Sequence, residues 1–449
     1  MRLKLLTLAL ALTAVALPSY GMDLLEAYRD ARANDPVLSQ ADATRLATGE
    51  GVSQARALLL PQISAGLTLS QTNGGGGTSF SDPNNPDQII DTSTFGHTRT
   101  RSINGTLSQT VFDFSKYANL KAAHSAADAQ DEIYQAAQQA LFVRVVTAYF
   151  DVLTSEDALT FAKANEDAFR QQFEQSDQRF KVGLSAITDV YQAKAFHEAA
   201  KAQTITAQNA LNDAREALTQ ITNKPVGNLK KLRDDLPMQP PSPNDQEAWV
   251  KQALATNPNL LAQRQNVQTA EHNITAARAG HLPTISAQVT YNKNSSWFQD
   301  AAIRSNRPAS TTIGLSLNVP IFSGGTTQSL VRQSIYQRDA AADSMESERR
   351  QVVRDTLNFY RTVIAGIAQV ESAKASVESG QKALDAMRAG FDVGTQTMTD
   401  VLLAIQTLTS SESSYSQARH QFILNKLLLK QAAGTADLSD LQTINALLQ

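Results

Sequence analysis

Cysteine is absent from the 449-residue sequence, which excludes a disulfide framework and an N-terminal lipid anchor on cysteine. Only 18% of the residues are charged, and the formal net charge of −3 leaves no basic surplus for binding nucleic acid. After residue 21 no apolar run reaches about 18 residues, so a membrane-spanning helix is not expected there.

The beginning of the chain has the form of a secretory signal. Arg2 and Lys4 precede the apolar run 5–17, and the small residues Ser19 and Gly21 occupy the −3 and −1 positions of a cleavage site. We expect residues 1–21 to be a signal peptide and the mature chain to begin near Met22.

The sequence gives little support to the hypothesis that the chain is an enzyme. The histidines are scattered, and "HEAAK" at 197–201 lacks the second histidine of a zinc-binding H-E-x-x-H motif. "NGGGG" at 73–77 opens no helix and is not followed by Lys-Ser/Thr, which indicates a loop and not a phosphate site. We therefore predict no catalytic residues and no cofactor.

An internal duplication dominates the organisation of the chain. The matching pairs are "NDPVL" (34–38) with "TNPNL" (256–260), "ARALLLPQISA" (55–65) with "ARAGHLPTISA" (277–287), "LSQTVFDFSK" (107–116) with "LSLNVPIFSG" (315–324), and "KVGLSAITDV" (181–190) with "DVGTQTMTDV" (392–401). We predict two repeats, 22–223 and 248–433, joined by a proline-rich connector at 224–247 and followed by a C-terminal segment at 434–449.

Each repeat is expected to contain a helix, two strands, a long helix and a return helix. In the first repeat the helices are predicted at 23–60, 114–181 and 185–222, and the strands at about 61–72 and 98–113. In the second they are predicted at 246–282, 326–388 and 395–432, with strands at about 283–294 and 310–322. The segments between paired strands, 72–97 and 294–310, are rich in glycine, asparagine and serine and are expected to be loops.

The predicted strands alternate between apolar and polar residues. A half-buried soluble sheet would show this pattern, and so would a membrane β-barrel with a water-filled lumen. Four strands cannot close a barrel alone, because the smallest membrane barrels have about eight and open edges cannot face lipid. A membrane barrel here would have to be shared between chains. By strand parity Arg99 and Arg101 point outward near the outer rim, where either lipid phosphates or water would surround them.

The long helices are too long for an ordinary globular domain. A helix over 114–181 would extend roughly 100 Å at about 1.5 Å per residue. Seven-residue spacing predicts supercoiled neighbours in the return helices, at Val401, Leu408, Tyr415, Phe422 and Leu429 and at Ala193, Ala200, Ala207 and Ala214. A helical bundle core would explain the heptads but not the length, which suits a hollow cylinder.

An ordered set of motifs identifies a family. The motifs are "LLPQISAGL", "HLPTISAQV", "QTVFDFSK", "VPIFSGG", "TAYFDVL", "RFKVGLSAITDV" and "GFDVGTQTMTDVLLA". Over essentially its whole mature length the chain resembles the TolC family of outer-membrane efflux and type I secretion exit ducts. The resemblance implies an α+β membrane protein and a homotrimer. A twelve-stranded transmembrane β-barrel, four strands per chain, would continue into a long α-helical coiled-coil barrel.

The resemblance also implies partners and a location. The chain would be a passive exit duct in the cell outer membrane of a Gram-negative bacterium, in contact with lipid and with a long periplasmic extension. It would receive its cargo from a periplasmic adaptor protein and an inner-membrane transporter. A mixed α/β girdle would surround the helical barrel, with 223–247 and 434–449 as its candidates.

The resemblance places two functional sites at or near the duplicated Val-Gly turns: the adaptor-docking surface and the periplasmic gate. The resemblance assigns adaptor docking to the tips Val182, Gly183, Leu184, Val393, Gly394 and Thr395. Ser185 and either Thr395 or Thr397 are also competent helix N-caps. The periplasmic gate is assigned to Thr188, Asp189, Phe391, Gln396 and Asp400.

Asp400, present once per protomer, would form a ring of three carboxylates. Mutual repulsion in such a ring raises the apparent pKa values, and the ring attracts cations; no other metal site is expected. The sequence departs from the family's best-known pattern at three positions: Leu403 replaces a second acidic ring, Gln396 an arginine and Phe391 a tyrosine. We therefore expect a weaker or differently held closed state and weaker block by multivalent cations.

Two other classes of non-enzyme remain open from the residues alone. A rigid periplasmic scaffold without a pore would explain the helices but not the amphipathic strands. A permanently open diffusion porin would explain the strands but would not need the distant hairpin tips.

Overall fold

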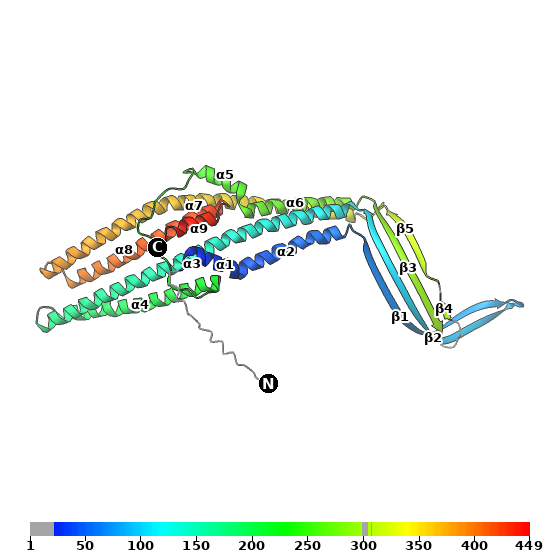
Figure 1. Cartoon of the computed structure of the whole chain (residues 1–449), viewed down its shortest axis with the longest axis horizontal. Coiled ribbons are helices and arrows are strands. Elements are labelled where there is room, and N and C mark those ends of the chain that lie inside the picture. Colours follow the sequence, from blue (N-terminus) through cyan, green and yellow to red (C-terminus); the bar gives the residue numbers. More distant parts are fainter. Residues whose placement is uncertain (1–21, 299–303, 307) are drawn as a thin grey trace, which may run out of the picture. The chain divides into compact units, whose positions relative to one another are not determined.

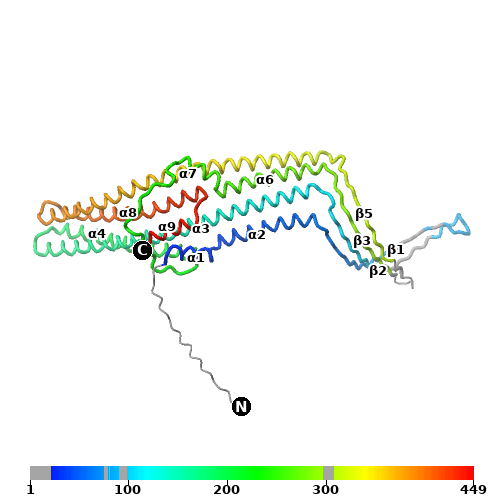
Figure 2. The backbone as a smooth tube through the Cα atoms, turned by 45° about the horizontal axis from the view of Figure 1, so that its top comes forward, coloured from blue at the N-terminus to red at the C-terminus, as the bar shows by residue number. Residues whose placement is uncertain are grey.

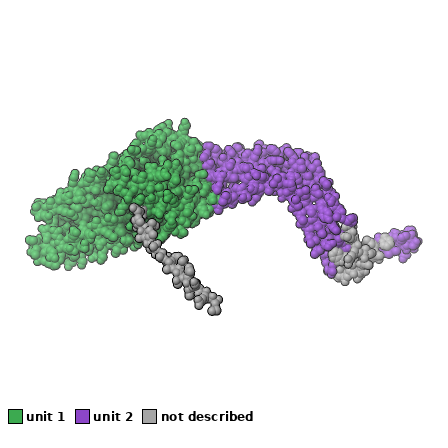
Figure 3. All heavy atoms as spheres, in the orientation of Figure 1, with its two compact units in different colours: residues 1–42, 133–260, 349–449 green, residues 43–132, 261–348 purple. Residues whose placement is uncertain are grey.

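The computed structural model describes residues 22–298, 304–306 and 308–449, so the predicted signal peptide lies outside the described residues. The chain divides into two compact units (Figure 3). Unit 1 comprises Met1–Asp42, Ile133–Leu260 and Arg349–Gln449, and unit 2 comprises Ala43–Glu132 and Leu261–Glu348. Two long helices contribute residues to both units.

The elements follow one another as labelled in Figure 1. The helices are α1 (Leu24–Asn34), α2 (Pro36–Ala57), α3 (Phe114–Lys181), α4 (Ile187–Thr222), α5 (Gln246–Thr256), α6 (Pro258–Ala279), α7 (Thr326–Asp392), α8 (Met398–Ala432) and α9 (Leu438–Asn445). The strands are β1 (Gln62–Asp82), β2 (Asn85–Phe112), β3 (Thr284–Phe298), β4 (Arg304–Asn306) and β5 (Ser310–Asn318). No helix in the described part of the chain is long and apolar enough to cross a membrane.

The helices predicted at 23–60 and 246–282 are each interrupted by a proline. Asp35 and Asn257 precede these prolines and have extended backbones, with ψ of 117° and 119°. Proline has no N–H for the helix and forces the preceding residue out of the helical region. The side chains of Asp35 and Asn257 then accept from the N–H groups of Leu38 (2.8 Å) and Leu260 (3.1 Å) and cap α2 and α6.

Unit 1 contains two antiparallel helical hairpins, in which α4 lies beside the end of α3 and α8 beside the end of α7 (Figures 1 and 2). The return helices begin at Ile187 and Met398, slightly later than predicted, and α7 continues to Asp392. The heptad residues are buried except for the half-buried Ala214 and Tyr415, which confirms that the predicted stripes are packing faces.

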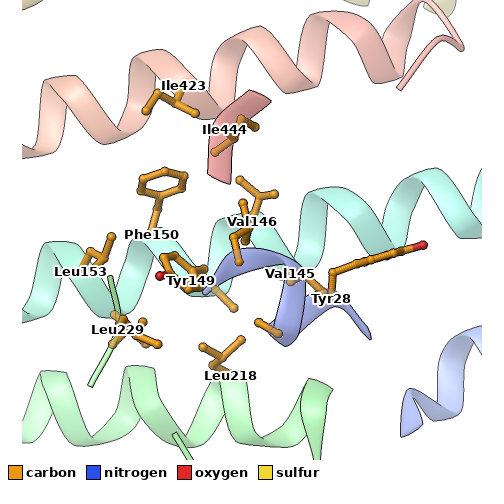
Figure 4. Packing of buried hydrophobic residues seen from close by; sticks show 14 of the residues in the cluster. Tyr28, Val145, Val146, Tyr149, Phe150, Leu153, Leu218, Leu229, Ile423 and Ile444 are labelled. Atoms are coloured by element: carbon orange, nitrogen blue, oxygen red, sulfur yellow. The ribbon is translucent and has the colours of Figure 1, made fainter. Parts of the chain in front are cut away.

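The largest core of unit 1 surrounds the middle of α3. Figure 4 shows Val146 and Phe150 directed toward Ile423 and Ile444, while Tyr149 lies on the side of Leu218 and Leu229. Tyr149 is fully buried, and its hydroxyl lies 3.0 Å from the carbonyl oxygens of Met22 and Lys230. Burial raises the pKa of Tyr149, so the hydroxyl remains a donor. This segment of α3 holds neighbouring helices on two sides.

The proline-rich connector and the C-terminal segment meet through backbone hydrogen bonds. Met22 forms a parallel bridge with Leu229, and Leu232 forms an antiparallel bridge with Leu448. The N–H of Lys231 donates to the carbonyl of Gln449 (3.0 Å), and the N–H of Gln449 donates back (2.8 Å). These extended pieces and the short helix α9 pack against the α3 core.

The sheet belongs to unit 2 and is antiparallel throughout. Its order is β1-β2-β3, and β4 and β5 both pair with β3 along successive stretches of that strand. The sheet is therefore four strands wide, as the sequence predicted. Within the described residues β1 and β5 each have one partner, which leaves both outer edges unpaired.

Three features of the sheet differ from the sequence expectation. Residues predicted as the loop 72–97 continue β1 and β2 into a long hairpin, because backbone pairing needs no alternation of side chains. The predicted loop 294–310 is partly paired for the same reason, since β3 runs to Phe298 and β4 pairs with it. Strand β5 ends at Asn318, short of the predicted 322, since Pro320 cannot donate to a ladder. The pairing of β2 with β3 shifts between Thr110 and Phe112, and this irregularity takes Val111 out of the ladder.

Candidate functional site: the hairpin tips and the two faces of the sheet

The turn between α3 and α4 closes helix α3 with a Schellman motif. The N–H of Leu184 donates to the carbonyl of Arg179 (2.8 Å), and the N–H of Gly183 donates to that of Phe180 (2.9 Å). Gly183 has a φ of +78°, in the left-handed region that favours glycine. The sequence places glycine where the helix must stop.

The turn between α7 and α8 has the same construction. The N–H of Thr395 donates to the carbonyl of Gly390 (2.8 Å), and the N–H of Gly394 donates to that of Phe391 (3.1 Å). Gly394 has a φ of +80°. Both Val-Gly sequences therefore form the same backbone turn.

These tips expose apolar side chains. Val182, Leu184 and Val393 are 68%, 72% and 75% exposed, and a Cβ added to Gly183 or Gly394 would meet no atom within 4 Å. Thr395 is also exposed. Such apolar groups are displayed to solvent without any packing role in the described chain, which is typical of a contact surface.

The first turn of α8 is held by a capping box. The Thr397 side chain accepts from the Asp400 N–H (3.3 Å), and an Asp400 carboxylate oxygen accepts from the Thr397 N–H (2.9 Å) and hydroxyl (2.6 Å). These hydrogen bonds to Thr397 lower the pKa of Asp400. The local structure thus favours the charged carboxylate.

One predicted cap is wrong and one is confirmed. Thr397 is the N-cap of α8, whereas the N-cap of α4 is Ala186, whose side chain makes no capping hydrogen bond. The Ser185 hydroxyl instead donates to the carboxylate of Asp189 (2.7 Å). A serine one residue before the N-cap lies outside the capping position, and the aspartate in the first turn takes its hydroxyl. Thr395 also caps no N-terminus, since its hydroxyl donates to the Gly390 carbonyl (3.1 Å).

The predicted gate residues lie near both turns but do not bond to one another within this chain. Among the described residues, no hydrogen bond joins Thr188 or Asp189 to Phe391, Gln396 or Asp400. Thr188 is exposed. The stem of Gln396 lies against Gly390, where an added Cβ would approach its Cγ to 2.6 Å.

Contacts between the two hairpins involve residues that sequence reasoning missed. The Arg179 guanidinium lies over the Phe391 ring, 4.7 Å from its centroid, and the Thr399 hydroxyl donates to the Gln192 amide oxygen (3.1 Å). Farther along, hydroxyl groups of α3 and α8 bond across the same boundary: Thr409 with Asn165 (3.3 Å), Ser416 with Asp157 (2.5 Å) and Thr154 with His420 (2.8 Å). Thr409, Ser416 and His420 lie outside the heptad positions, so the periodicity of α8 does not indicate this row.

His420 is the most buried titratable side chain in that row. It is 6% exposed, and its ring lies 5.2 Å from that of Phe150. Burial lowers the pKa of His420 to about 4; the carboxylate of Asp157 opposes this shift and Arg419 reinforces it. The imidazole is therefore neutral at physiological pH.

One face of the sheet is polar across its whole width. In register, Ser64 pairs with Thr106, Thr106 with Thr290 and Thr290 with Thr312, and the row beside it pairs Gly66, Asn104, Asn292 and Ser310. Thr100 and Ser296 lie within hydrogen-bonding distance on the same face (3.4 Å). This face offers continuous rows of hydroxyl and amide groups.

The opposite face is apolar and exposed. Ile63, Leu107, Val289 and Ile313 form one row across the strands, and Ile63 and Ile313 are 81% and 79% exposed. Leu315 and Leu317 on β5 are 73% and 63% exposed. A soluble sheet would bury this face, whereas nothing in unit 2 covers it among the described residues.

No group of three or more histidine, aspartate or glutamate side chains within the described ranges is placed to hold a metal ion.

Comparisons with known proteins agree on one family. The family described as outer membrane efflux protein matches residues 27–224 and 249–435. Outer membrane protein TolC of Escherichia coli (strain K12) is 33% identical over 447 residues, which cover 98% of this chain and 87% of TolC. The alkaline protease secretion protein AprF of Pseudomonas aeruginosa is 25% identical, covering 95% of this chain and 88% of AprF.

A solved structure has the same fold at lower identity. The outer membrane channel CmeC of Campylobacter jejuni aligns with a TM-score of 0.75 and 17% identity, covering 95% of this chain and 90% of CmeC. With the exposed apolar sheet face and the paired hairpin tips, these matches show that the chain belongs to the outer membrane efflux protein family and is a protein of the Gram-negative outer membrane.

Proposed function

We propose that the chain is one protomer of a homotrimeric, passive exit duct that spans the outer membrane. The observation that carries this proposal is the sheet, which has one exposed apolar face, one polar face and two unpaired edges. In lipid, unpaired backbone groups at an edge are costly, so the edges must meet those of other copies. Three copies of a sheet four strands wide give a closed barrel of twelve strands with a polar lumen.

The helical hairpins of unit 1 supply the periplasmic part of the duct in this proposal. The similar Schellman turns and the similar proline breaks at Asp35 and Asn257 support two repeats, 22–223 and 248–433, in each protomer. Three protomers would then contribute twelve long helices to one coiled-coil barrel. The connector 224–247 and the segment 434–449 would form the girdle around it.

The tips would dock a periplasmic adaptor, which links the duct to an inner-membrane transporter. Val182, Leu184 and Val393 offer apolar contacts, and the bare Gly183 and Gly394 allow a partner helix to approach closely. Since the family is described as outer membrane efflux protein and AprF is named as an alkaline protease secretion protein, the proposed cargo is small molecules, secreted proteins or both. The energy for transport would come from the partners.

Planar bilayer recording of the purified trimer tests the duct directly. Small, flickering, cation-preferring steps are expected. Silence from well-folded trimers would favour a scaffold without a pore, and large steady currents would indicate a permanently open channel.

Removing the Asp400 charge is expected to weaken channel block by hexamminecobalt(III) at least about tenfold, because a ring of three carboxylates would be lost. Asp400→Asn is the suitable change, since the amide oxygen can still accept from Thr397 and preserve the helix cap. The measurement is single-channel current against cobalt concentration at neutral pH, where the hydrogen bonds from Thr397 keep Asp400 ionised.

A matched control is Asp385→Asn, which removes an exposed carboxylate that also accepts a side-chain hydrogen bond, from Gln381 (3.1 Å). Its block should equal that of the unaltered channel. Block that is insensitive to Asp400→Asn would refute the carboxylate ring.

Restoring the family's gate residues is expected to reduce the open fraction of the channel several-fold. In Phe391→Tyr with Gln396→Arg, the added hydroxyl and guanidinium can reach neighbouring helices, and Gly390 leaves room for the arginine stem. Gln396→Met with Phe391→Tyr is the control, because methionine has a similar stem without donors. An equal open fraction in the two double variants would show that the arginine at 396 does not hold the gate.

A further inference from the structure

Three basic residues gather on the apolar face of the sheet. Arg101 of β2 pairs with Leu69 and Ser295, Arg99 pairs with Gln71, and Lys293 of β3 pairs with Ile103. Directly paired residues point to the same side, and residues two apart on a strand do so as well. Arg99, Arg101 and Lys293 therefore share the face of Leu67 and Leu69.

Among the described side chains, no carboxylate neutralises these cations. The Arg99 guanidinium donates to the amide oxygen of Gln71 (3.0 Å), a neutral group. Within the described residues no carboxylate lies within ion-pair distance of Arg99, Arg101 or Lys293, whereas Arg45 in the same unit is paired with Asp131 (3.5 Å). Arg99 and Arg101 are exposed and Lys293 is half-buried.

The position of the cluster along the strands matches the edge of a membrane. From Ile285, the first outward residue of β3, to Ser295, which pairs with Arg101, the strand advances roughly 33 Å at about 3.3 Å per residue. A tilt of about 40° reduces this to roughly 25 Å, the height of the apolar band of a membrane barrel. Arg101 lies at that boundary, Arg99 lies beyond it, and the flexible Lys293 stem can reach it from within.

We propose that Arg99, Arg101 and Lys293 form a binding site for the phosphate groups of outer-leaflet lipid, an inference that rests on the proposed membrane barrel. Each guanidinium group can bind two oxygens of one phosphate at the same time, and Lys293 adds a third positive charge to the same site. Diagonal positions on neighbouring strands, such as those of Arg101 and Lys293, lie about 7–8 Å apart, within the reach of two long side chains that share one phosphate or bridge two.

Lipid is the occupant because the surrounding surface is apolar. Leu67, Leu69 and Ile103 beside the cations are 63%, 68% and 38% exposed. A free phosphate ion would bind the cations but leave these side chains in water, whereas a phosphorylated lipid covers them with its acyl chains. The site would fix the level of the barrel in the membrane.

The test uses the purified full-length trimer in detergent and native mass spectrometry with bisphosphorylated lipid A as the probe. The triple variant Arg99→Gln/Arg101→Gln/Lys293→Gln is expected to bind the lipid at least about tenfold more weakly. Its matched control, Arg361→Gln/Lys374→Gln/Lys382→Gln, removes three exposed charges from α7 of unit 1 and should bind as the unaltered protein does. Lipid A without phosphates should bind weakly to all three proteins.

The outcomes separate this site from the duct. Equal affinity in the triple variant, or an equal loss in the control, would overturn the lipid site, and complete competition by millimolar inorganic phosphate would assign it to a free anion. The same samples are recorded in planar bilayers. Conducting trimers with no difference in lipid affinity would refute the site alone, while silent trimers with the expected difference would refute conduction and leave both the membrane barrel and the site in place.

Discussion

Asparagine in place of Gly183 or Gly394 is expected to abolish export from cells while the trimer assembles in normal amounts. Both glycines have φ near +80°, which asparagine adopts more readily than other residues with side chains. A Cβ at either position meets no atom within 4 Å. The substitution therefore keeps the turn and adds only a side chain that projects from the tip, where the adaptor would have to approach.

Two further variants separate contact from folding. Valine at position 183 or 394 should also abolish export, and it strains the turn by about 1–2 kcal/mol, since a branched side chain disfavours this conformation. Gly49→Asn changes a glycine of α2 that also has open space around its Cβ, and export should be unaffected. Export is measured in cells whose chromosomal copy is replaced, with trimer abundance in the outer membrane as the reference. Normal export by Gly183→Asn and Gly394→Asn would contradict docking at the glycines.

The backbone of the tips could be predicted from sequence because its causes are local. Glycine at the end of a helix selects the Schellman turn, and Thr397 with Asp400 three residues later forms a capping box. The heptad stripes and the two faces of the sheet were also predictable, because burial follows the period of each element.

Partners across the hairpin boundary could not be predicted in this way. Arg179 lies over Phe391, and Thr399 bonds to Gln192, across sequence separations of roughly 200 residues. No pattern within one helix fixes which residue faces it on another. The hairpin beyond residue 72 was missed for a related reason: its backbone pairing carries no hydrophobic alternation, so glycine and serine suggested a loop.

Acidification should loosen the packing of α8 on α3 through His420. The folded pKa of His420, about 4, lies below its ordinary value of 6.5, so the open state binds the proton first as the pH falls. The stabilisation is complete above about pH 6.5 and is lost progressively down to about pH 4. The full loss is about 3 kcal/mol, of which about 2 kcal/mol is lost by pH 5.

His420→Gln should abolish this pH dependence, because glutamine can keep a hydrogen bond to Thr154 but has no proton to gain in this range. Hydrogen exchange of the α8 amides near residue 420, corrected for intrinsic rates, measures the local opening free energy at pH 7.5 and pH 5. The unaltered protein should lose about 2 kcal/mol of protection between these values, and the exposed His124→Gln variant should lose as much. If His420→Gln lost as much protection between pH 7.5 and pH 5 as the unaltered protein does, groups other than His420 would have to bind the proton. The buried Thr154–His420 contact would then contribute to packing without making the stability depend on pH.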